Sequence, residues 1–349
     1  MTQLYTTDVA RIGKLKGEIL KRAMAQEVLG ITGQHKPIPK NNSDTVEYKR
    51  YLPYGGVDNV WVASGGDAAF VAAHLTAEGV TPSADTITSV TVTSVLQEYA
   101  ALYSYTNKTG EMHEDDIPSE MIDQTSERLT LVREMVRYGE LKSCGNAFFG
   151  GAGTDRSTVD GPISVTMLRL IERALLGKHG KLITEILAPS PNFATAPVQA
   201  AFLVFTHTDV IADIEGLPGY THVSEYGQRK PVHEMERGSW GAFRFIVSPE
   251  LVPIPDAGAA VGATGLYSTT GSNIDIYPMI ITAKNAWGST ALRGVESLSA
   301  NHIPPGTKDK SDPLGQRGYI GARIWFDTTI LNDDWMAVAE VGVSAAPTT

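Results

Sequence analysis

Apolar residues recur at the spacing of an amphipathic helix in three segments of the chain, residues 8–29, 117–142 and 165–176. The longest segment, 117–142, carries Pro118 and Glu120 in its first turn. A missing N–H costs little there, and a carboxylate suits the positive end of the helix dipole. At 1.5 Å per residue this helix would be about 40 Å long. The pattern therefore predicts one long helix and two shorter ones.

Strand-like patterns occupy much of the remaining chain. Residues 45–51 and 88–93 alternate between the two faces of a strand, the second most cleanly. Short apolar runs predict further strands, at residues 201–205, 241–247, 277–281, 319–326 and 335–341. We expect the last two to be joined by Asn332-Asp333-Asp334. Separate helices and strands in this order are typical of an α+β fold.

Two regions carry little core of their own. Residues 1–54 combine the first helix with Pro-rich extended chain through Pro39, and residues 55–106 read as a long two-stranded excursion. Its expected strands are residues 57–62 and 87–105. An isolated hairpin is marginal in water unless something covers it. Both regions are shaped to lie on another surface, although the first fits an ordinary helix and strand of one compact domain equally well.

Composition and charge restrict the class of partner. The chain has 349 residues, of which 42% are hydrophobic and 19% charged, and its net charge is −10. The charged fraction is below the usual quarter or so of globular proteins, which fits burial against partners but also a plain Gly- and Ala-rich globular protein. Tight DNA binding needs a basic face that releases counterions from phosphates. We therefore expect no tight or sequence-specific DNA binding; an acidic lining, if that face carries the charge, would let DNA slide over the protein.

The chain shows no sign of export or membrane insertion. Its first residues, Met1-Thr2-Gln3-Leu4, lack the basic and apolar regions of a signal peptide, so no cleaved leader is expected. The apolar stretches are shorter than the roughly 18–20 residues of a membrane helix. Cys144 is the only cysteine, which excludes an intramolecular disulfide and a multi-cysteine zinc site. We expect a soluble protein assembled in a reducing cytoplasm.

The candidate catalytic and ligand-binding sites in the sequence lack the neighbouring residues that such sites require. Gly150–Gly153 lacks the Gly-Lys-Ser/Thr of a phosphate loop, and His207 with Asp209 offers too few ligands for a metal. The acidic run 111–116 is typical of a solvated turn before a helix. Cys144 ends an apolar helix and has no positioned base. The sequence therefore predicts no catalytic residue, no cofactor, no metal and no enzyme.

Two blocks near opposite ends of the chain carry a family resemblance. The first has Ile38-Pro39-Lys40-Asn41-Asn42 and then Lys49-Arg50. The second has Asp312-Pro313-Leu314-Gly315-Gln316-Arg317-Gly318 and then Leu331-Asn332-Asp333-Asp334-Trp335-Met336. With shorter matches at 76–82 and 238–245, they resemble the major capsid proteins of tailed phages, of the N-four type. The resemblance covers most of the chain and is weakest at 187–200 and 256–273.

This resemblance implies the Hong Kong 97 fold and a set of domains. The domains would be an N-arm at 1–54, an extended loop at 55–115, a peripheral domain at 116–185 and 305–349 with a spine helix at 117–142, and an axial domain at 186–304. It also implies hexamers and pentamers that close into an icosahedral shell around a double-stranded DNA genome. Portal, scaffolding and decoration proteins would be further partners. The protein would belong to the virion and assemble in the cytoplasm of a host bacterium.

Five residues are candidates for contacts between subunits. We expect ion pairs from Lys49, Arg50 and Arg317 and packing by Trp240 and Trp335, although packing within one chain is an equally good interpretation of each. An encapsulin-like nanocompartment shell of the same fold is the alternative function. A third possibility, from a different class, is an enzyme with an unrecognised site in residues 186–304.

Overall fold

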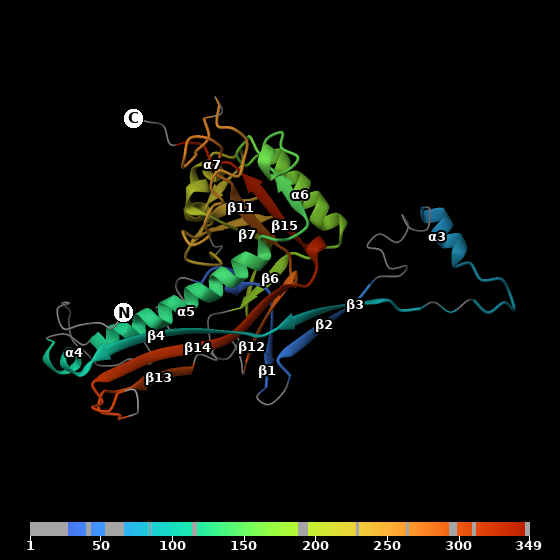
Figure 1. The fold of residues 1–349 in the computed structure, drawn as a ribbon. Helices are drawn as coiled ribbons and strands as arrows, with labels where there is room; N and C mark the ends of the chain where they lie inside the picture. The colour runs from blue at the N-terminus through green and yellow to red at the C-terminus, as the bar shows by residue number, and fades with distance from the viewer. Residues whose placement is uncertain are drawn as a thin grey trace.

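The structure is a computed structural model that describes most of the chain (Figure 1). The described residues are 27–39, 43–52, 66–82, 84, 86–113, 117–187, 195–227, 230–262, 265–292, 299–308 and 312–345. Two sheets and one long helix, α5 (Ile117–Leu141), organise them. The predicted helix at 117–142 is thus confirmed to within a residue. The predicted helix at 8–29 lies almost wholly outside the described residues, which begin there with Glu27 and a 3-10 turn, η1 (Leu29–Ile31).

An eight-stranded mixed sheet forms the larger core. Its strands are β5 (Ala147–Phe149), β6 (Ile183–Leu187), β7 (Thr195–Thr206), β8 (Thr221–His222), β9 (Glu236–Trp240), β10 (Phe243–Val247), β11 (Tyr277–Thr282) and β15 (Met336–Val341). Every residue of β10, β11 and β15 is buried. Continuous apolar runs are expected where both faces of a sheet are covered.

Alternate residues of β7 show what covers the two faces. Phe202 and Val204 pack in the cluster that contains α6 (Val165–Gly177), whereas Leu203 and Phe205 pack in the cluster that contains the end of α5. Period-two alternation along the strand sends successive side chains to opposite faces. The short helices η4 (Thr208–Val210) and α7 (Ile211–Glu215) follow β7.

A five-stranded sheet lies under the other half of α5 (Figure 1). Its strands are β1 (Gln34–Ile38), β4 (Gln97–Thr106), β12 (Trp287–Leu292), β13 (Ser299–Ile303) and β14 (Arg317–Ile330). β14 alternates between buried and more exposed positions, and Ile324 and Phe326 pack with Leu129 of α5. The long helix therefore joins the cores of both sheets.

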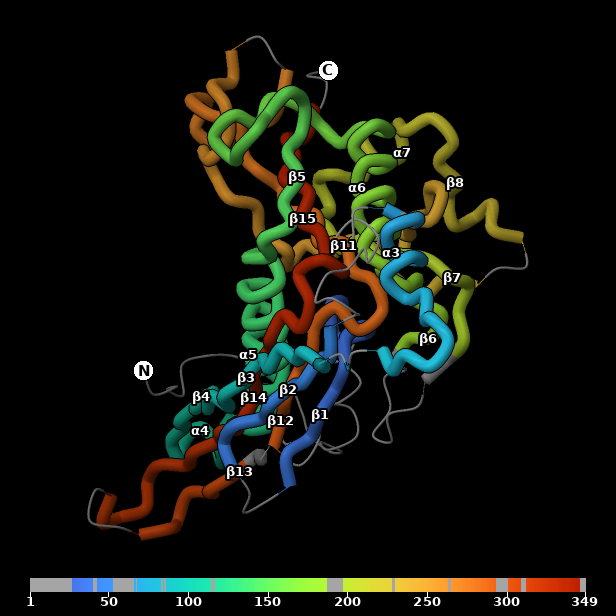
Figure 2. Tube along the Cα trace, turned by 90° about the vertical axis from the view of Figure 1, so that its right-hand side faces the viewer, coloured from blue at the N-terminus to red at the C-terminus, as the bar shows by residue number. Residues whose placement is uncertain are grey.

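Residues 87–105, expected as one strand of a hairpin, form two strands with different partners. β3 (Ser89–Val95) pairs antiparallel with β2 (Thr45–Tyr51), and β4 pairs with β14. The other expected strand, 57–62, lies outside the described residues, so its pairing stays a prediction. The β2–β3 ribbon carries α3 (Asp67–Ala73) far from both sheets in Figure 1; in Figure 2, which faces the side from which α3 projects, α3 lies in front of the body. A short helix, α4 (Asn107–Met112), follows β4.

The last two strands do not form a hairpin. β14 and β15 belong to different sheets, and the short helix η6 (Asp333–Trp335) turns the chain from one to the other. Their local patterns fit two strands but do not say which partners bury them. The stretch 256–273 is tied at its base because Asp275 accepts hydrogen bonds from the backbone N–H groups of Asp256 and Thr269, both at 2.9 Å.

Candidate functional site

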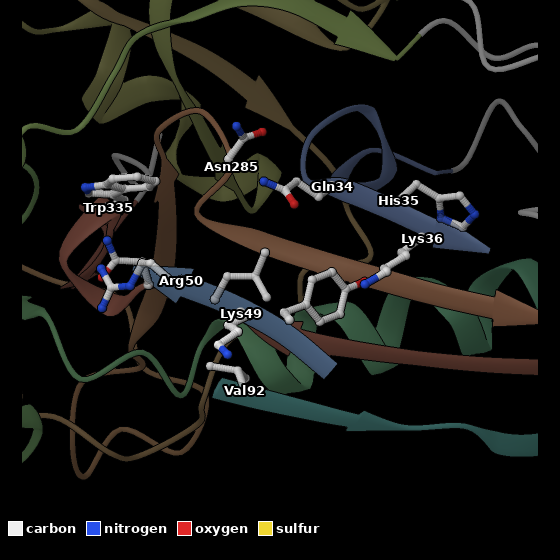
Figure 3. A pocket seen from close by; sticks show the side chains of 11 residues that line it. Gln34, His35, Lys36, Lys49, Arg50, Val92, Asn285 and Trp335 are labelled. Carbon is white, nitrogen blue, oxygen red and sulfur yellow. The ribbon is translucent and has the colours of Figure 1, made fainter. Parts of the chain in front are cut away.

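Parts of the two blocks that carry the family resemblance meet in space around a groove of about 500 Å³ (Figure 3): Lys49-Arg50 from the first block, and Leu331, Asn332 and Trp335 from the second. We call it the basic groove. It is lined by Gln34, His35, Lys36, Tyr48, Lys49, Arg50, Val92, Asn285, Leu331, Asn332 and Trp335. β1 and β2 supply one side, and the turn between β14 and β15 supplies the other. Residues nearly 300 positions apart in the sequence therefore build one surface.

Tyr48 fixes β2 against the five-stranded sheet. Its hydroxyl donates to the carbonyl oxygen of Ser289 at 3.3 Å and lies 3.0 Å from Thr290 Oγ1, both on β12. Its ring packs in a small core with Leu331 and Trp325. Lys36 Nζ donates to the carbonyl oxygen of Glu47 at 3.1 Å, which joins β1 to β2. These contacts hold the two cationic strands in place at the edge of the body.

The opposite wall is built on η6. Asn332 caps this short helix by accepting a hydrogen bond from Asp334 N at 3.3 Å. Trp335 Nε1 donates to the carbonyl oxygen of Lys178 at 3.0 Å, so the indole ring is fixed across the end of α6. In Figure 3 the side chains of Trp335 and Arg50 lie toward one end of the groove, and those of His35 and Lys36 lie toward the other end.

The groove carries hydrogen-bond donors and positive charge. No Asp or Glu lines it among the residues that the structure describes, and no ion pair joins Lys36, Lys49 or Arg50 to a described carboxylate. Burial lowers the pKa of His35 to about 4, so this side chain is neutral at pH 7. The positive charge at neutral pH therefore comes from the two lysines and the arginine.

Two buried donors at the groove lack a partner. Within the described part of the chain, Arg50 Nε and Asn332 Nδ2 make no hydrogen bond although both atoms are shielded from solvent. Leaving a buried donor unsatisfied costs about 1–3 kcal/mol. An acceptor from outside the described residues would remove that cost.

The structure brings together three of the five predicted contact residues. Lys49, Arg50 and Trp335 line the basic groove. Trp240 lies elsewhere, 9% exposed in the core of the eight-stranded sheet, with its Nε1 donating to the carbonyl oxygen of Pro218 at 2.9 Å. Arg317 is exposed at the start of β14. Whether any of the five contacts a second subunit stays a prediction.

Sequence reasoning missed a buried ionic cluster that joins the N-terminal region to α5. Glu134 Oε1 accepts hydrogen bonds from Val28 N at 3.0 Å and Leu29 N at 2.8 Å. Glu27 pairs with Arg137 and, at 2.6 Å, with Arg133. Burial raises the pKa of Glu134 to about 7 and lowers that of Arg137 to about 9. The only signal in the sequence was a Glu and an Arg three residues apart beside an apolar stripe.

The chemical candidates behave as structural residues. Burial raises the pKa of the Cys144 thiol to about 12, so it is not a nucleophile at neutral pH. His207 accepts a hydrogen bond from Asp209 N at 3.1 Å and caps a helical turn. Among the described residues, no group of three His, Cys, Asp or Glu side chains could hold a metal ion. None of the described helices is both long and apolar enough to span a membrane.

Comparison with known proteins gives one curated relative and many similar folds. The major capsid protein of Pseudomonas phage KPP21 is 22% identical over 262 residues, covering 70% of this chain and 65% of that protein. No family model matches the chain. The relationship in sequence is therefore distant and spans slightly less than two thirds of the relative.

The similar structures span the whole chain. The capsid of Ralstonia phage GP4 has a TM-score of 0.62 at 11% identity and covers 100% of this chain and 96% of its own. The capsid of cyanophage Pam1 has a TM-score of 0.59 at 12% identity, covering 99% and 97%. The head of Helicobacter pylori phage KHP40 has a TM-score of 0.58 at 10% identity, covering 97% and 94%. The chain therefore has the α+β, Hong Kong 97-type fold of tailed-phage capsid proteins.

Proposed function

We propose that this chain is the major capsid protein of a tailed phage, whose copies assemble into the icosahedral shell around a double-stranded DNA genome. The observation that carries this proposal is the exposed segment between the strands of the β2–β3 ribbon. We call residues 66–88 the projecting segment. Its apolar side chains Val71, Leu75, Val80 and Ile87 are 66%, 83%, 61% and 82% exposed.

Such a segment needs a cover that the described part of its own chain does not supply. Figure 1 places α3 well away from both sheets. Several large apolar side chains exposed on one short segment favour an interaction site, and a two-stranded ribbon is marginal without packing. The same surface on every copy, docking on a different surface of the next, gives a heterologous contact that closes into rings. Many weak contacts of this kind together hold a shell.

The remaining parts of the proposal follow from the shell. The pentamers and hexamers would meet portal, scaffolding and decoration proteins, assemble in the host cytoplasm and become part of the virion. The domain division belongs here too: an N-arm at 1–54, an extended loop at 55–115, a peripheral domain at 116–185 and 305–349, and an axial domain at 186–304. β15 crosses this division, because it pairs with β11 in the eight-stranded sheet. A structural role, not an enzymatic one, is proposed throughout.

Electron microscopy of the purified protein, across protein and salt concentration, tests the proposal. Closed shells, tubes or rings of five or six subunits are the expected result. A monomer or dimer under all conditions, even with scaffolding proteins supplied, would contradict it and would favour the enzyme hypothesis. Shells that purify with enzyme cargo in place of DNA would favour the nanocompartment. The named relatives above are all phage capsid proteins, so nothing described favours that alternative at present.

A further inference from the structure

The basic groove concentrates positive charge in a protein whose net charge is −10. Lys36, Lys49 and Arg50 line it, and no carboxylate of the described residues does. Figure 3 shows Lys36 toward one end of the groove, Arg50 toward the other and Lys49 between them. The positive charges therefore lie in a row, which is the arrangement that a chain of anionic groups requires.

Asn332 adds a buried hydrogen-bond donor to the groove. This residue is only 4% exposed, and its side-chain oxygen is already used, because it accepts from Asp334 N at 3.3 Å. Its Nδ2 makes no hydrogen bond within the described part of the chain, and neither does the shielded Nε of Arg50. Buried donors are nearly always paired in folded proteins. The groove therefore suits a ligand that brings acceptor atoms to both donors.

We propose that the basic groove binds a short chain of phosphate groups, such as a tripolyphosphate or the triphosphate of a nucleotide. The inference concerns a ligand site and does not depend on the proposed shell. Each phosphate group brings negative charge and several acceptor oxygens, so successive groups meet Arg50, Lys49 and Lys36 in turn. An arginine fork matches phosphate oxygens in geometry, and a lysine binds phosphate as a point charge. The volume of about 500 Å³ is in the range of small-ligand sites.

The number of acceptor oxygens favours phosphate over a carboxylate at one end of the groove. Asn332 caps the turn that carries Trp335, and Trp335 and Arg50 lie toward the same end (Figure 3). A terminal phosphate presents three acceptor oxygens, whereas a carboxylate presents two. The terminal phosphate therefore belongs at this end, and the rest of the chain extends toward Lys36.

The net charge of the protein favours a short ligand over a nucleic acid. Without the three cations of the groove, the remaining chain has a net charge of −10 − 3 = −13. A duplex reaches beyond the groove over that acidic surface and is repelled by it. A chain of a few phosphate groups stays within the groove, where the nearest charges are positive. Screening by salt weakens charges more than about 8 Å away at physiological ionic strength.

Calorimetric titration of the full-length, unassembled protein with sodium tripolyphosphate tests the proposal. We expect saturable binding of one ligand per chain. Lys49→Gln combined with Arg50→Gln should weaken it at least about tenfold, because two charge-assisted contacts are lost. Arg169→Gln combined with Arg173→Gln, on the exposed face of α6, removes the same charge and should bind as the wild type does. Circular dichroism checks the folding of each variant.

A second variant, Asn332→Asp, tests the buried donor. The aspartate keeps an oxygen that accepts from Asp334 N, but it replaces the Nδ2 donor by an acceptor with negative charge. We expect this variant, too, to bind tripolyphosphate at least about tenfold more weakly. No binding to the wild type, or equal loss in the groove pair and the α6 pair, would overturn the proposal. Shells formed by a wild type that does not bind tripolyphosphate would leave the capsid function intact.

Competition for bound tripolyphosphate identifies the class of ligand. Adenosine triphosphate should displace it, since the same row of phosphate groups is present. A hexaglutamate peptide should displace it at least about tenfold less well, and a short DNA duplex likewise. A peptide that competes as well as the nucleotide would overturn the proposal, because an acidic protein segment would then be the better occupant. A duplex that competes better than the nucleotide would also overturn it, because nucleic acid would then be the occupant.

Discussion

At the residue scale, Glu134 shows how the N-terminal region is attached to the body. Its carboxylate accepts two backbone N–H groups of residues 28 and 29, and Arg137 lies beside it with its guanidinium 4.9 Å from the Phe326 ring. Removing one partner from a buried ionic cluster is costly because the other charge stays buried. The cluster therefore holds the start of the described chain against α5 and β14.

We expect Glu134→Ala to lower the free energy of unfolding by about 3–5 kcal/mol. It leaves two buried N–H donors without an acceptor and removes one of the two carboxylates beside Arg137. Glu134→Gln should cost less, since its side-chain oxygen can still accept from both N–H groups. Urea denaturation measures the change, with Glu111→Gln on the exposed part of α4 as control. A loss of under about 1 kcal/mol for Glu134→Ala would contradict this account.

The same residue predicts a pH dependence. Burial raises the pKa of Glu134 from 4.5 to about 7 in the folded protein. The folded state therefore binds more protons than the unfolded state between these values, so this group's contribution to stability falls as pH rises from about 4.5 to about 7. The difference in unfolding free energy between the wild type and Glu134→Gln should show this fall. A difference that stays constant across the window would be the contrary result.

At the scale of an element, the Gly-rich stretch after β5 is a packed loop. Gly150 N donates to the carbonyl oxygen of Glu340 on β15 at 2.8 Å. The Glu340 carboxylate accepts hydrogen bonds from two guanidinium nitrogens of Arg156 at 2.5–3.0 Å. A Cβ on Gly150 would overlap the carbonyl oxygen of Gly161. The glycines permit two stretches of backbone to touch, which is a different use from cradling a phosphate.

Gly150→Ala should destabilise the protein by about 1–3 kcal/mol, because a backbone oxygen and not a flexible side chain must move. Gly145→Ala is a matched control a few residues away, since nothing lies within 4 Å of its added Cβ. Thermal or urea denaturation of the two variants gives the comparison. Equal stability of both would show that the loop is not packed as described.

At the scale of the whole molecule, stability and assembly depend on different parts. The two sheets and α5 hold the cores, whereas the projecting segment contributes apolar surface that remains exposed in the single chain. A change in that segment should therefore alter contacts between copies without altering the fold of one copy.

We expect Leu75→Ser combined with Ile87→Ser to leave the melting temperature of the unassembled protein within a degree or two of the wild type, and to block shell formation. Leu176→Ser, at a half-exposed leucine of α6, is the matched control and should assemble normally. Calorimetry and electron microscopy measure the two effects. A variant that melts much earlier would mean that the segment stabilises its own chain.

Hydrophobic periodicity in the sequence predicted those helices and strands in which it follows the buried face of the element. The 25-residue helix α5 and the strands β2, β10, β11 and β15 lie where periodicity placed them. β1, β12 and β13 went unpredicted, because they are short and mix Pro, Gly, Ser, Asn or His with apolar residues. β1 is extended chain in the sequence and becomes a strand only by pairing with β12.

The sequence alone determined which residues needed burial, the α+β character of the chain and, through two motifs, its resemblance to capsid proteins. Only the tertiary structure decided which strands pair, that β14 and β15 belong to different sheets, and that Lys49, Arg50 and Trp335 share one groove. The physical reason is that periodicity reports the face that a residue turns toward the core. The partner across that core is chosen by contacts between residues tens to hundreds of positions apart, and a local pattern does not record them.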